Sequence, residues 1–299
     1  MGHSKDMAPR IGFVGIGLMG SRMSQRLLQA GYELIIWNRS PDKCQTLVTQ
    51  GATLAPTLAY VAEHSDIIFL CLADTHAVES VVFDEQGLAN ALSSGQLIVD
   101  FSSITPDATR LFAQRLAAQN IHWLDCPVSG GVMGAEKGTL ILMAGGEAAQ
   151  IERFKPIAQH LGQKLTHMGD AGTGQITKIC NQMIVASNAV LIAETVALAA
   201  KAGVDARQLA PALAGGFADS LPLQILAPRM ATDSFEPVQW KVQTLLKDLD
   251  NAVALAKENT SSTPISALAS QLLRLHAATG ASLEDLSSVV KLFKNADLK

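Results

Sequence analysis

The strand pattern of this chain stops near residue 172, and this break constrains the fold more than any other feature. Before it, short apolar runs alternate with segments of helical spacing, and the runs lie at 11–15, 33–37, 66–72, 97–100, 122–125 and 139–143. Near-continuous apolar strands separated by helices predict a parallel sheet with helices on both faces. Because crossovers between parallel strands are right-handed, we expect a doubly wound α/β domain of the Rossmann type.

After the break the sequence contains only helical patterns. A long, largely apolar helix is predicted first, and shorter helices follow it; together they lie at 175–201, 206–214, 224–231, 242–258, 264–278 and 283–293. We therefore predict two domains. Residues 1–172 form the α/β domain, and residues 173–299 form an all-helical domain led by a long interdomain helix, which serves substrate binding and oligomerisation.

The composition excludes several classes of protein. With 48% hydrophobic and 17% charged residues, the 299-residue chain is not intrinsically disordered. Its net charge of −4 lacks the basic excess of a nucleic-acid-binding protein, so no nucleic-acid partner is expected. The four cysteines include no CxxC pair, a spacing that fits neither a zinc site nor a disulfide scaffold. We expect no metal site and a cytoplasmic protein, since residues 1–10 lack the apolar core of a secretory signal.

The segment 183–200 is almost wholly apolar and has the length of a membrane span. It contains Glu194 together with Ser187, Asn188 and Thr195. A carboxylate in the middle of a bilayer costs several kcal/mol, so we interpret the segment as a buried helix of a soluble protein, with no membrane partner. Its apolar character also predicts burial against another subunit, in a homodimer or homotetramer.

A glycine-rich turn follows the first strand and opens a helix. In the GxGxxG pattern the first glycine permits a tight turn, the second lets the backbone approach a pyrophosphate, and the third lets the helix pack on the strand. The free N–H groups and the dipole of the helix N-terminus favour the phosphates. The residues that we assign to dinucleotide binding are Gly15, Ile16, Gly17, Leu18, Met19 and Gly20.

The second strand ends in Asn38, Arg39 and Ser40. An NAD site usually places an acidic residue here for the ribose hydroxyls, whereas an NADP site has a neutral residue and a nearby arginine for the 2′-phosphate. A guanidinium can hold that phosphate through charge-assisted hydrogen bonds. We therefore expect the first domain to bind NADP(H) in preference. The alternative is that Arg39 is a solvated loop residue and that the cofactor is NAD(H).

Two further patterns suggest a site for a small carboxylate. Ser129, Gly130 and Gly131 follow the fifth strand, where a glycine loop can converge N–H groups on an anion and the serine adds a hydroxyl donor. Lys178 and Asn181 share one face of the long helix, with Gln182 beside them. In a cleft, the surroundings of a lysine can shift the pKa of its ammonium group so that it acts as a proton donor. The alternatives are a flexible glycine loop and a lysine that extends to solvent.

These motifs carry a family resemblance. The sequences GIGLMG, DCPVSGGVMGAEKGTL, GTGQITKICNQ and KDLDNA occur in the order found in the β-hydroxyacid dehydrogenases, and the resemblance extends from Ile11 to about Phe293. The resemblance implies that the first motif binds the dinucleotide and the second the substrate carboxylate. It implies that Lys178 is the catalytic proton donor and that Asn181 positions the substrate.

The resemblance adds residues that the spacing alone does not identify. Lys247 matches a lysine near cofactor and substrate, and Asp248 follows it as in relatives; together with Gln182 it is expected to support the site. Ser102 and Ser103 match positions that contact the nicotinamide end of the cofactor. Leu72 and Ala73 match the neighbouring cofactor loop, although relatives often have a proline there. Cys126 replaces a usual alanine, and we interpret it as a small packing residue, the alternative being an oxidation-sensitive thiol.

The expected activity is hydride transfer between NADP(H) and a short β-hydroxyacid or semialdehyde. Succinic semialdehyde, glyoxylate and tartronate semialdehyde are the substrate types that the resemblance implies. One competing function is that of an imine reductase, which generally lacks the lysine. Another is a non-catalytic NADP-binding sensor or scaffold, which would have no need of Ser129, Lys178, Asn181 and Lys247 together.

Overall fold

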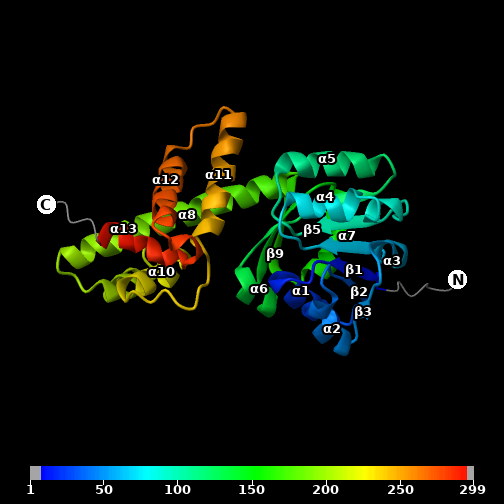
Figure 1. The fold of residues 1–299 in the computed structure, drawn as a ribbon, viewed down its shortest axis with the longest axis horizontal. Coiled ribbons are helices and arrows are strands. Elements are labelled where there is room, and N and C mark those ends of the chain that lie inside the picture. The colour runs from blue at the N-terminus through cyan, green and yellow to red at the C-terminus, as the bar shows by residue number, and fades with distance from the viewer. Residues whose placement is uncertain (1–7, 295–299) are drawn as a thin grey trace. The chain divides into compact units, whose positions relative to one another are not determined.

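The computed structural model describes residues 8–294 of the chain, which divide into two compact units between Lys178 and Ile179. Each unit is described by itself (Figure 1). The first contains the sheet, and the second contains most of the long helix α8 (Thr173–Lys201) and the helices that follow it.

The first unit is built on a nine-stranded sheet with the order β3-β2-β1-β4-β5-β6-β8-β7, and β9 pairs with β8. The strands are β1 (Ile11–Val14), β2 (Leu34–Trp37), β3 (Thr53–Leu54), β4 (Ile67–Leu70), β5 (Leu97–Asp100), β6 (His122–Asp125), β7 (Val128–Ser129), β8 (Leu140–Gly145) and β9 (Gly162–Gly169). The first six run parallel, with Ile11 opposite both Leu34 and Ile67. This order confirms the predicted Rossmann fold.

The far side of the sheet differs from the prediction of a purely parallel sheet. β8 runs antiparallel to β6 and β7, so the sixth predicted strand was given the wrong direction. β9, which pairs parallel with β8, was not predicted at all. Its pattern is largely exposed and polar, because it lies beside only one neighbour, and such a strand lacks the apolar run that identified the others.

Side chains alternate between the two faces of the sheet and form two hydrophobic cores. Phe13 and Phe69 pack on the face covered by α1 (Leu18–Gln29) and α7 (Ala148–Ala158). Val14 points to the other face, covered by α3 (Leu58–His64), α4 (Thr75–Phe83) and α5 (Pro106–Ala117). Figure 1 shows α4 and α5 on one side of the sheet and α1 on the other. The remaining helices of this unit are η1 (Pro41–Cys44), α2 (Gln45–Thr49), η2 (Leu88–Asn90) and α6 (Gly131–Lys137).

The second unit is all-helical, as predicted. After α8 its elements are η3 (Ala206–Gln208), α9 (Leu209–Leu213), α10 (Leu221–Ala231), α11 (Val242–Glu258), α12 (Pro264–Ala278), η4 (Ala281–Leu283), η5 (Leu286–Val290) and α13 (Lys291–Lys294). Buried side chains of α8, α10, α11 and α12 form one core, with Val196, Leu226, Leu249 and Leu273 among them. The single α-helix predicted at 283–293 is wrong: Asp285, the N-cap, accepts from the N–H of Ser287 and begins a 3-10 helix at Leu286, which is followed by one α-helical turn at Lys291–Lys294.

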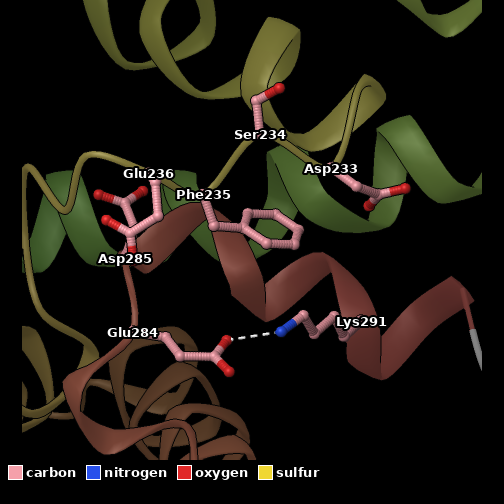
Figure 2. A pocket seen from close by; sticks show the side chains of 7 residues that line it. All are labelled: Asp233, Ser234, Phe235, Glu236, Glu284, Asp285 and Lys291. Carbon is pink, nitrogen blue, oxygen red and sulfur yellow. Dashed lines mark hydrogen bonds and ion pairs between the residues drawn. The ribbon is translucent and has the colours of Figure 1, made fainter.

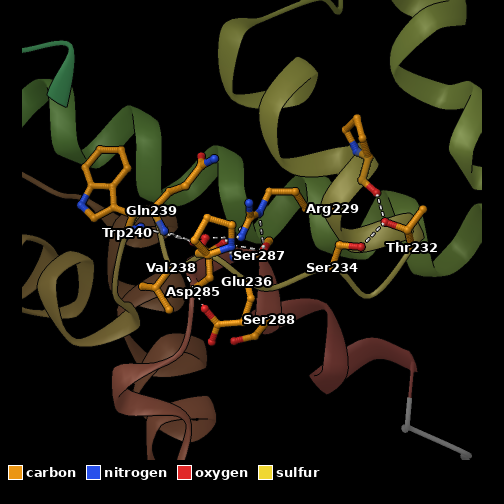
Figure 3. A network of polar contacts seen from close by, with 12 residues as sticks. Arg229, Thr232, Ser234, Glu236, Val238, Gln239, Trp240, Asp285, Ser287 and Ser288 are labelled. Carbon is orange, nitrogen blue, oxygen red and sulfur yellow. Dashed lines mark hydrogen bonds and ion pairs between the residues drawn. The ribbon is translucent and has the colours of Figure 1, made fainter. Parts of the chain in front are cut away.

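A buried ion pair organises the segment between α10 and α11. Asp285 is 2% exposed and lies 3.4 Å from the guanidinium of Arg229. The same carboxylate accepts hydrogen bonds from the backbone N–H groups of Gln239 and Trp240 (Figure 3). A shallow cavity of about 470 Å³ lies nearby, and Figure 2 shows its acidic lining, where Glu284 pairs with Lys291 at 2.7 Å. Because each of these contacts is made within the protein, we interpret the network as structural.

By length and composition, α8 is the one helix of residues 8–294 that could cross a membrane, with a mean hydropathy of 1.9 over its most apolar window. In the structure, 39% of that window is buried. The core helix of a soluble protein passes the same test, so this finding is weak evidence for a membrane span.

Candidate active site

The glycine-rich turn has the shape that a pyrophosphate needs. A Cβ on Gly20 would lie 2.0 Å from the carbonyl oxygen of Gly15, so the start of α1 packs directly on the turn. A Cβ on Gly17 would meet nothing within 4 Å, which leaves the backbone accessible at the helix N-terminus. Gly17 is the N-cap of α1 and supplies no side-chain cap. No side chain caps this first turn, although the N–H of Gly20 bonds to the thiol of Cys71, so its accessible N–H groups can bind phosphate oxygens and the residues present fit a dinucleotide.

The turn after β2 is fastened to this loop by one side chain. The backbone N–H of Ile16 donates to Oδ1 of Asn38 at 3.0 Å, and Nδ2 of Asn38 donates to the carbonyl of Ser40 at 2.9 Å. Asn38 therefore shapes the turn, whereas Arg39 and Ser40 are exposed. An aspartate at position 38 could accept from Ile16 but could not donate to Ser40, so the amide is required for the second bond.

Leu72 and Ser102 join the loops that follow β4 and β5. The N–H of Leu72 donates to Oγ of Ser102 at 2.9 Å, and the N–H of Ser102 donates to Oδ1 of Asp100 at 2.9 Å. Ser102 is 2% exposed, so its hydroxyl serves this junction, whereas Ser103 and Ala73 are exposed. The structure thus places one of the two predicted serines in the interior and the other at the surface.

Asp100 is an unusual group at this edge of the sheet. Its carboxyl is fully buried, and Oδ2 has no hydrogen-bond partner within the described part of the chain. Burial raises the pKa of Asp100 to about 7, because desolvation disfavours the charged form; the hydrogen bonds from Ser102 act in the opposite direction. The neighbouring charge of Asp125 adds to the rise in this pKa.

Gln175 is a buried residue that our sequence analysis missed. Its Nε2 donates to the carbonyl of Ser102 at 2.7 Å, and its Oε1 accepts from the N–H of Ile104 at 3.3 Å. The side chain is 1% exposed and lies on α8, three positions before Lys178. It therefore ties the helix that carries the lysine to the loop after β5. The sequence signal that could have identified Gln175 is its amide side chain, which stands near the start of a largely apolar helix.

Asp125 fixes the start of α8 from the other side. Its Oδ1 accepts from the N–H of Gly172 at 2.8 Å, and its Oδ2 accepts from the N–H of Gln175 at 2.9 Å. Burial raises the pKa of Asp125, while these backbone donors oppose the rise. Since Asp125 ends β6, it links the beginning of α8 to the strand that leads into the Ser129 loop.

Lys178 lies against the predicted carboxylate loop. Its Nζ donates to the carbonyl of Val128 at 3.0 Å, one residue before Ser129. Ser129 is half-buried, and Gly130 and Gly131 are exposed with φ values of 127° and 59°. These conformations favour glycine and turn the loop sharply into α6. The first unit thus brings the ammonium group of Lys178 to within hydrogen-bond distance of this loop.

Asn181, Gln182 and Asp248 form a second group within the helical unit. Nδ2 of Asn181 donates to Oε1 of Gln182 at 2.9 Å, and Nε2 of Gln182 donates to Oδ2 of Asp248 at 2.5 Å. Lys247, beside them on α11, is exposed. Cys126 is fully buried in the first unit, and burial raises the pKa of its thiol well above the ordinary value, which fits a packing role.

Comparisons with known proteins now identify the class of this chain. Residues 10–169 match the family of the NAD-binding domain of 6-phosphogluconate dehydrogenase, and residues 172–293 match the NAD-binding family of NADP-dependent 3-hydroxyisobutyrate dehydrogenase. A similar relative is 2-hydroxy-3-oxopropionate reductase of Escherichia coli strain K12, which is 40% identical over 94% of this chain and 96% of its own length. A solved structure of Mycobacterium tuberculosis 3-hydroxyisobutyrate dehydrogenase with L-serine has a TM-score of 0.87 at 27% identity, covering 96% of this chain and 100% of that one.

The chain belongs to the β-hydroxyacid dehydrogenase family. It is an NAD(P)-dependent oxidoreductase of the hydroxyacid type, as the motifs led us to expect. An imine reductase of Bacillus cereus BAG3X2 is a more distant neighbour, with a TM-score of 0.63 at 21% identity, covering 96% of this chain and 99% of that one. That likeness shows a shared fold alone.

Proposed function

We propose that this enzyme reduces a short semialdehyde that carries a carboxylate, with NADPH as the preferred cofactor and Lys178 as the proton donor. The observation that carries this proposal is the bond of 3.0 Å between Nζ of Lys178 and the carbonyl of Val128. It places an ammonium group beside Ser129, Gly130 and Gly131, where a substrate carboxylate can accept from backbone and hydroxyl donors.

The chemistry follows from the placement of these groups. The turn with Gly15, Gly17 and Gly20 would hold the dinucleotide, which when bound would provide a hydride for the aldehyde carbon. As the carbonyl oxygen gains negative charge, Lys178 stabilises it and donates the proton that completes the alcohol. In the reverse direction the amine of Lys178 accepts the alcohol proton. Ser129 and the two glycines hold the carboxylate; for Asn181 and Lys247, a role in orienting the substrate rests on the family resemblance alone.

The substrate class rests on the polar loop and on the relatives. The 40% identical relative is named for the reduction of 2-hydroxy-3-oxopropionate, which is tartronate semialdehyde. Tartronate semialdehyde, glyoxylate and succinic semialdehyde all pair a carboxylate with a reducible carbonyl, so each suits an ammonium beside an anion-binding loop. A panel of these compounds with NADPH, followed by loss of absorbance, tests the proposal. Turnover of at least one is expected, and failure with all of them, with NADPH bound, would contradict it.

The preference for NADPH rests on the turn after β2. Asn38 uses both ends of its amide on the backbone, and position 38 carries a neutral amide in place of the carboxylate that would repel a 2′-phosphate. Arg39 is exposed beside it and is available for a charge-assisted bond to that phosphate. NAD(H) is the alternative cofactor, and a comparison of kcat/KM for NADPH and NADH decides which one the enzyme prefers.

The enzyme is also proposed to be a homodimer or homotetramer in the cytoplasm. On α8, Ile184, Leu191 and Leu198 recur every seven residues and are 64%, 59% and 70% exposed. Such spacing puts them in one apolar stripe that a second copy of the chain can cover. Light scattering of the wild type and of Leu191→Glu tests this assembly, since a charge in the stripe should dissociate it. The cysteines are all free thiols, which suits a reducing compartment.

A further inference from the structure

Two carboxyl side chains stand next to each other in the interior of the first unit. Asp100 ends β5 and Asp125 ends β6, and the two residues are direct partners in the parallel register of these strands. Side chains at paired positions of neighbouring strands lie on the same face of a sheet. Both residues are fully buried. We refer to them as the carboxyl pair.

The two carboxyl groups differ in the hydrogen bonds that they accept. Oδ1 of Asp125 accepts from the N–H of Gly172 at 2.8 Å, and its Oδ2 accepts from the N–H of Gln175 at 2.9 Å. Oδ1 of Asp100 accepts from the N–H of Ser102, whereas Oδ2 has no hydrogen-bond partner within residues 8–294. A buried charged oxygen is costly without a donor and is stabilised by backbone N–H groups. A single proton on the pair therefore belongs to Asp100, and Asp125 is the ionised partner.

The surroundings of Asp100 favour its protonated form. Burial raises the pKa of Asp100, and the charge of Asp125 raises it further. The thiols of Cys71 and Cys126 are also coupled to this carboxyl, and both are neutral because burial raises their pKa values. Lys178, the first charged residue of α8, donates to a backbone carbonyl at 3.0 Å.

Both members of the carboxyl pair are attached to the first turn of α8. Asp125 accepts directly from the backbone N–H of Gln175. Asp100 holds the N–H of Ser102, and the carbonyl of Ser102 accepts from Nε2 of Gln175 at 2.7 Å. Lys178 follows Gln175 by three positions, which is less than one helical turn. A displacement of either carboxyl is therefore transmitted to the part of α8 that carries Lys178.

We propose that Asp100 is a positioning residue that must be protonated for catalysis, because a second charge beside Asp125 loosens the start of α8 and displaces Lys178. The inference rests on the proposed function, because it concerns the proton donor of the same site. Ionisation of Asp100 places two carboxylates opposite each other in the interior, and their repulsion is relieved when one of them releases its backbone donors. The pKa of Asp100, about 7, places this change near neutral pH. The enzyme therefore loses activity above neutral pH.

The ratio of the Asp100→Asn rate to the wild-type rate isolates the effect of this residue. Asparagine keeps an oxygen for the N–H of Ser102 and cannot ionise, so the variant corresponds to protonated Asp100. Lys178 donates a proton in reduction and accepts one in oxidation, so its own dependence on pH has opposite signs in the two directions. That dependence cancels in the ratio, because both proteins contain Lys178.

Single-turnover rates measure this ratio in both directions. The reactants are NADPH with the semialdehyde that is turned over in the panel above, and NADP⁺ with the corresponding alcohol. We expect the ratio to rise by about tenfold or more between pH 6 and pH 9 in each direction, because only the wild type loses its proton at position 100. Asp107→Asn, which changes an exposed carboxylate of α5, is the matched control and should give a constant ratio. A ratio for Asp100→Asn that is constant with pH, or that changes in opposite senses in the two directions, would overturn the inference.

Infrared difference spectra measure the proton itself, without substrate. A protonated carboxyl group has a carbonyl stretching band that a carboxylate lacks. The spectrum of the wild type minus that of Asp100→Asn should show this band at pH 6 and lose most of it by pH 9, and a pH titration of the wild type alone gives the same test if the variant does not fold. Absence of the band at pH 6, or its persistence at pH 9, contradicts the inference. Wild-type hydride transfer in Lys178→Ala contradicts the proposed function instead, so the two failures are distinguishable.

Discussion

Two turns at the carboxyl edge of the same sheet are held in very different ways. The loop after β5 is fixed by three hydrogen bonds of Ser102: its N–H donates to Asp100, its hydroxyl accepts from the N–H of Leu72, and its carbonyl accepts from Gln175. In the turn after β2, the side-chain bonds that hold the turn come from Asn38, beside backbone bonds at Trp37 and Ser40, and both Arg39 and Ser40 are exposed. The first is fastened to the helix that carries Lys178, whereas the second displays an arginine to solvent.

The difference matches what each turn is proposed to do. Hydride and proton transfer require reacting atoms to be held closely, and a displacement of about 1 Å can cost about a hundredfold in rate. Selection of a 2′-phosphate requires only a charge of the right sign within reach, which an exposed side chain can provide. Changes at the loop after β5 should therefore affect kcat, and changes at the turn after β2 should affect cofactor choice.

The largest effect in this comparison is expected from Gln175→Ala. The variant leaves the buried carbonyl of Ser102 and the N–H of Ile104 without their partner, so the loop and α8 lose their common anchor. We expect kcat to fall by about tenfold to a hundredfold, with a smaller change in the KM for NADPH. Steady-state kinetics measure both, and Gln114→Ala, at an exposed position of α5, is the control. A fall confined to the KM for NADPH would contradict the role of Gln175.

A smaller and more selective effect is expected from Arg39→Ala. Loss of the guanidinium should lower kcat/KM for NADPH by about tenfold and leave that for NADH nearly unchanged. The ratio of the two cofactors is the measurement. Arg110→Ala removes a similarly exposed arginine from α5 and should leave the ratio unchanged. If Arg39→Ala lowers kcat/KM for both cofactors alike, the arginine does not select the 2′-phosphate.

The smallest effect concerns stability rather than catalysis. The pKa of Asp100 in the folded protein is raised from 3.8 to about 7, so the folded state retains a proton that the unfolded state loses. The contribution of Asp100 to the free energy of unfolding is therefore fully present below pH 3.8 and is lost as the pH rises through about 7. Asp100→Asn removes this loss while keeping an oxygen for the N–H of Ser102.

The melting temperature of Asp100→Asn, relative to the wild type, should therefore rise by a few degrees between pH 5 and pH 8, a shift of about the size that 1 kcal/mol produces. Asp107→Asn changes an exposed carboxylate of α5 and is the control. A difference between Asp100→Asn and the wild type that does not change with pH would show that Asp100 is ionised throughout.

Much of this organisation could be predicted from local patterns. The apolar runs identified β1, β2, β4, β5 and β6, and the glycines of 15–20 identified the phosphate turn, because both signals lie within short segments. β9 was missed because an exposed strand lacks an apolar run, and β8 was given the wrong direction because a run of residues does not encode its direction.

The buried anchors of the site could not be predicted in this way. Gln175 and Asp125 bond to residues far away in the chain, such as Ser102 and Gly172. Nothing in the sequence next to a glutamine or an aspartate indicates such a distant partner. The bond from Gln182 on α8 to Asp248 on α11 likewise joins two helices that are far apart in the sequence. Such roles come from tertiary contacts, which spacing along one sequence does not reveal.

The most direct test of the account is the rate of hydride transfer in Lys178→Ala, measured in a single turnover with NADPH and a semialdehyde substrate. Loss of the proton donor should slow this step by about 10²–10⁴-fold, while the Kd for NADPH stays within about twofold of the wild type, because Lys178 bonds to the carbonyl of Val128 at the Ser129 loop and the phosphate turn lies at Gly15–Gly20. Hydride transfer at the wild-type rate in Lys178→Ala would contradict the assignment of Lys178 as the proton donor.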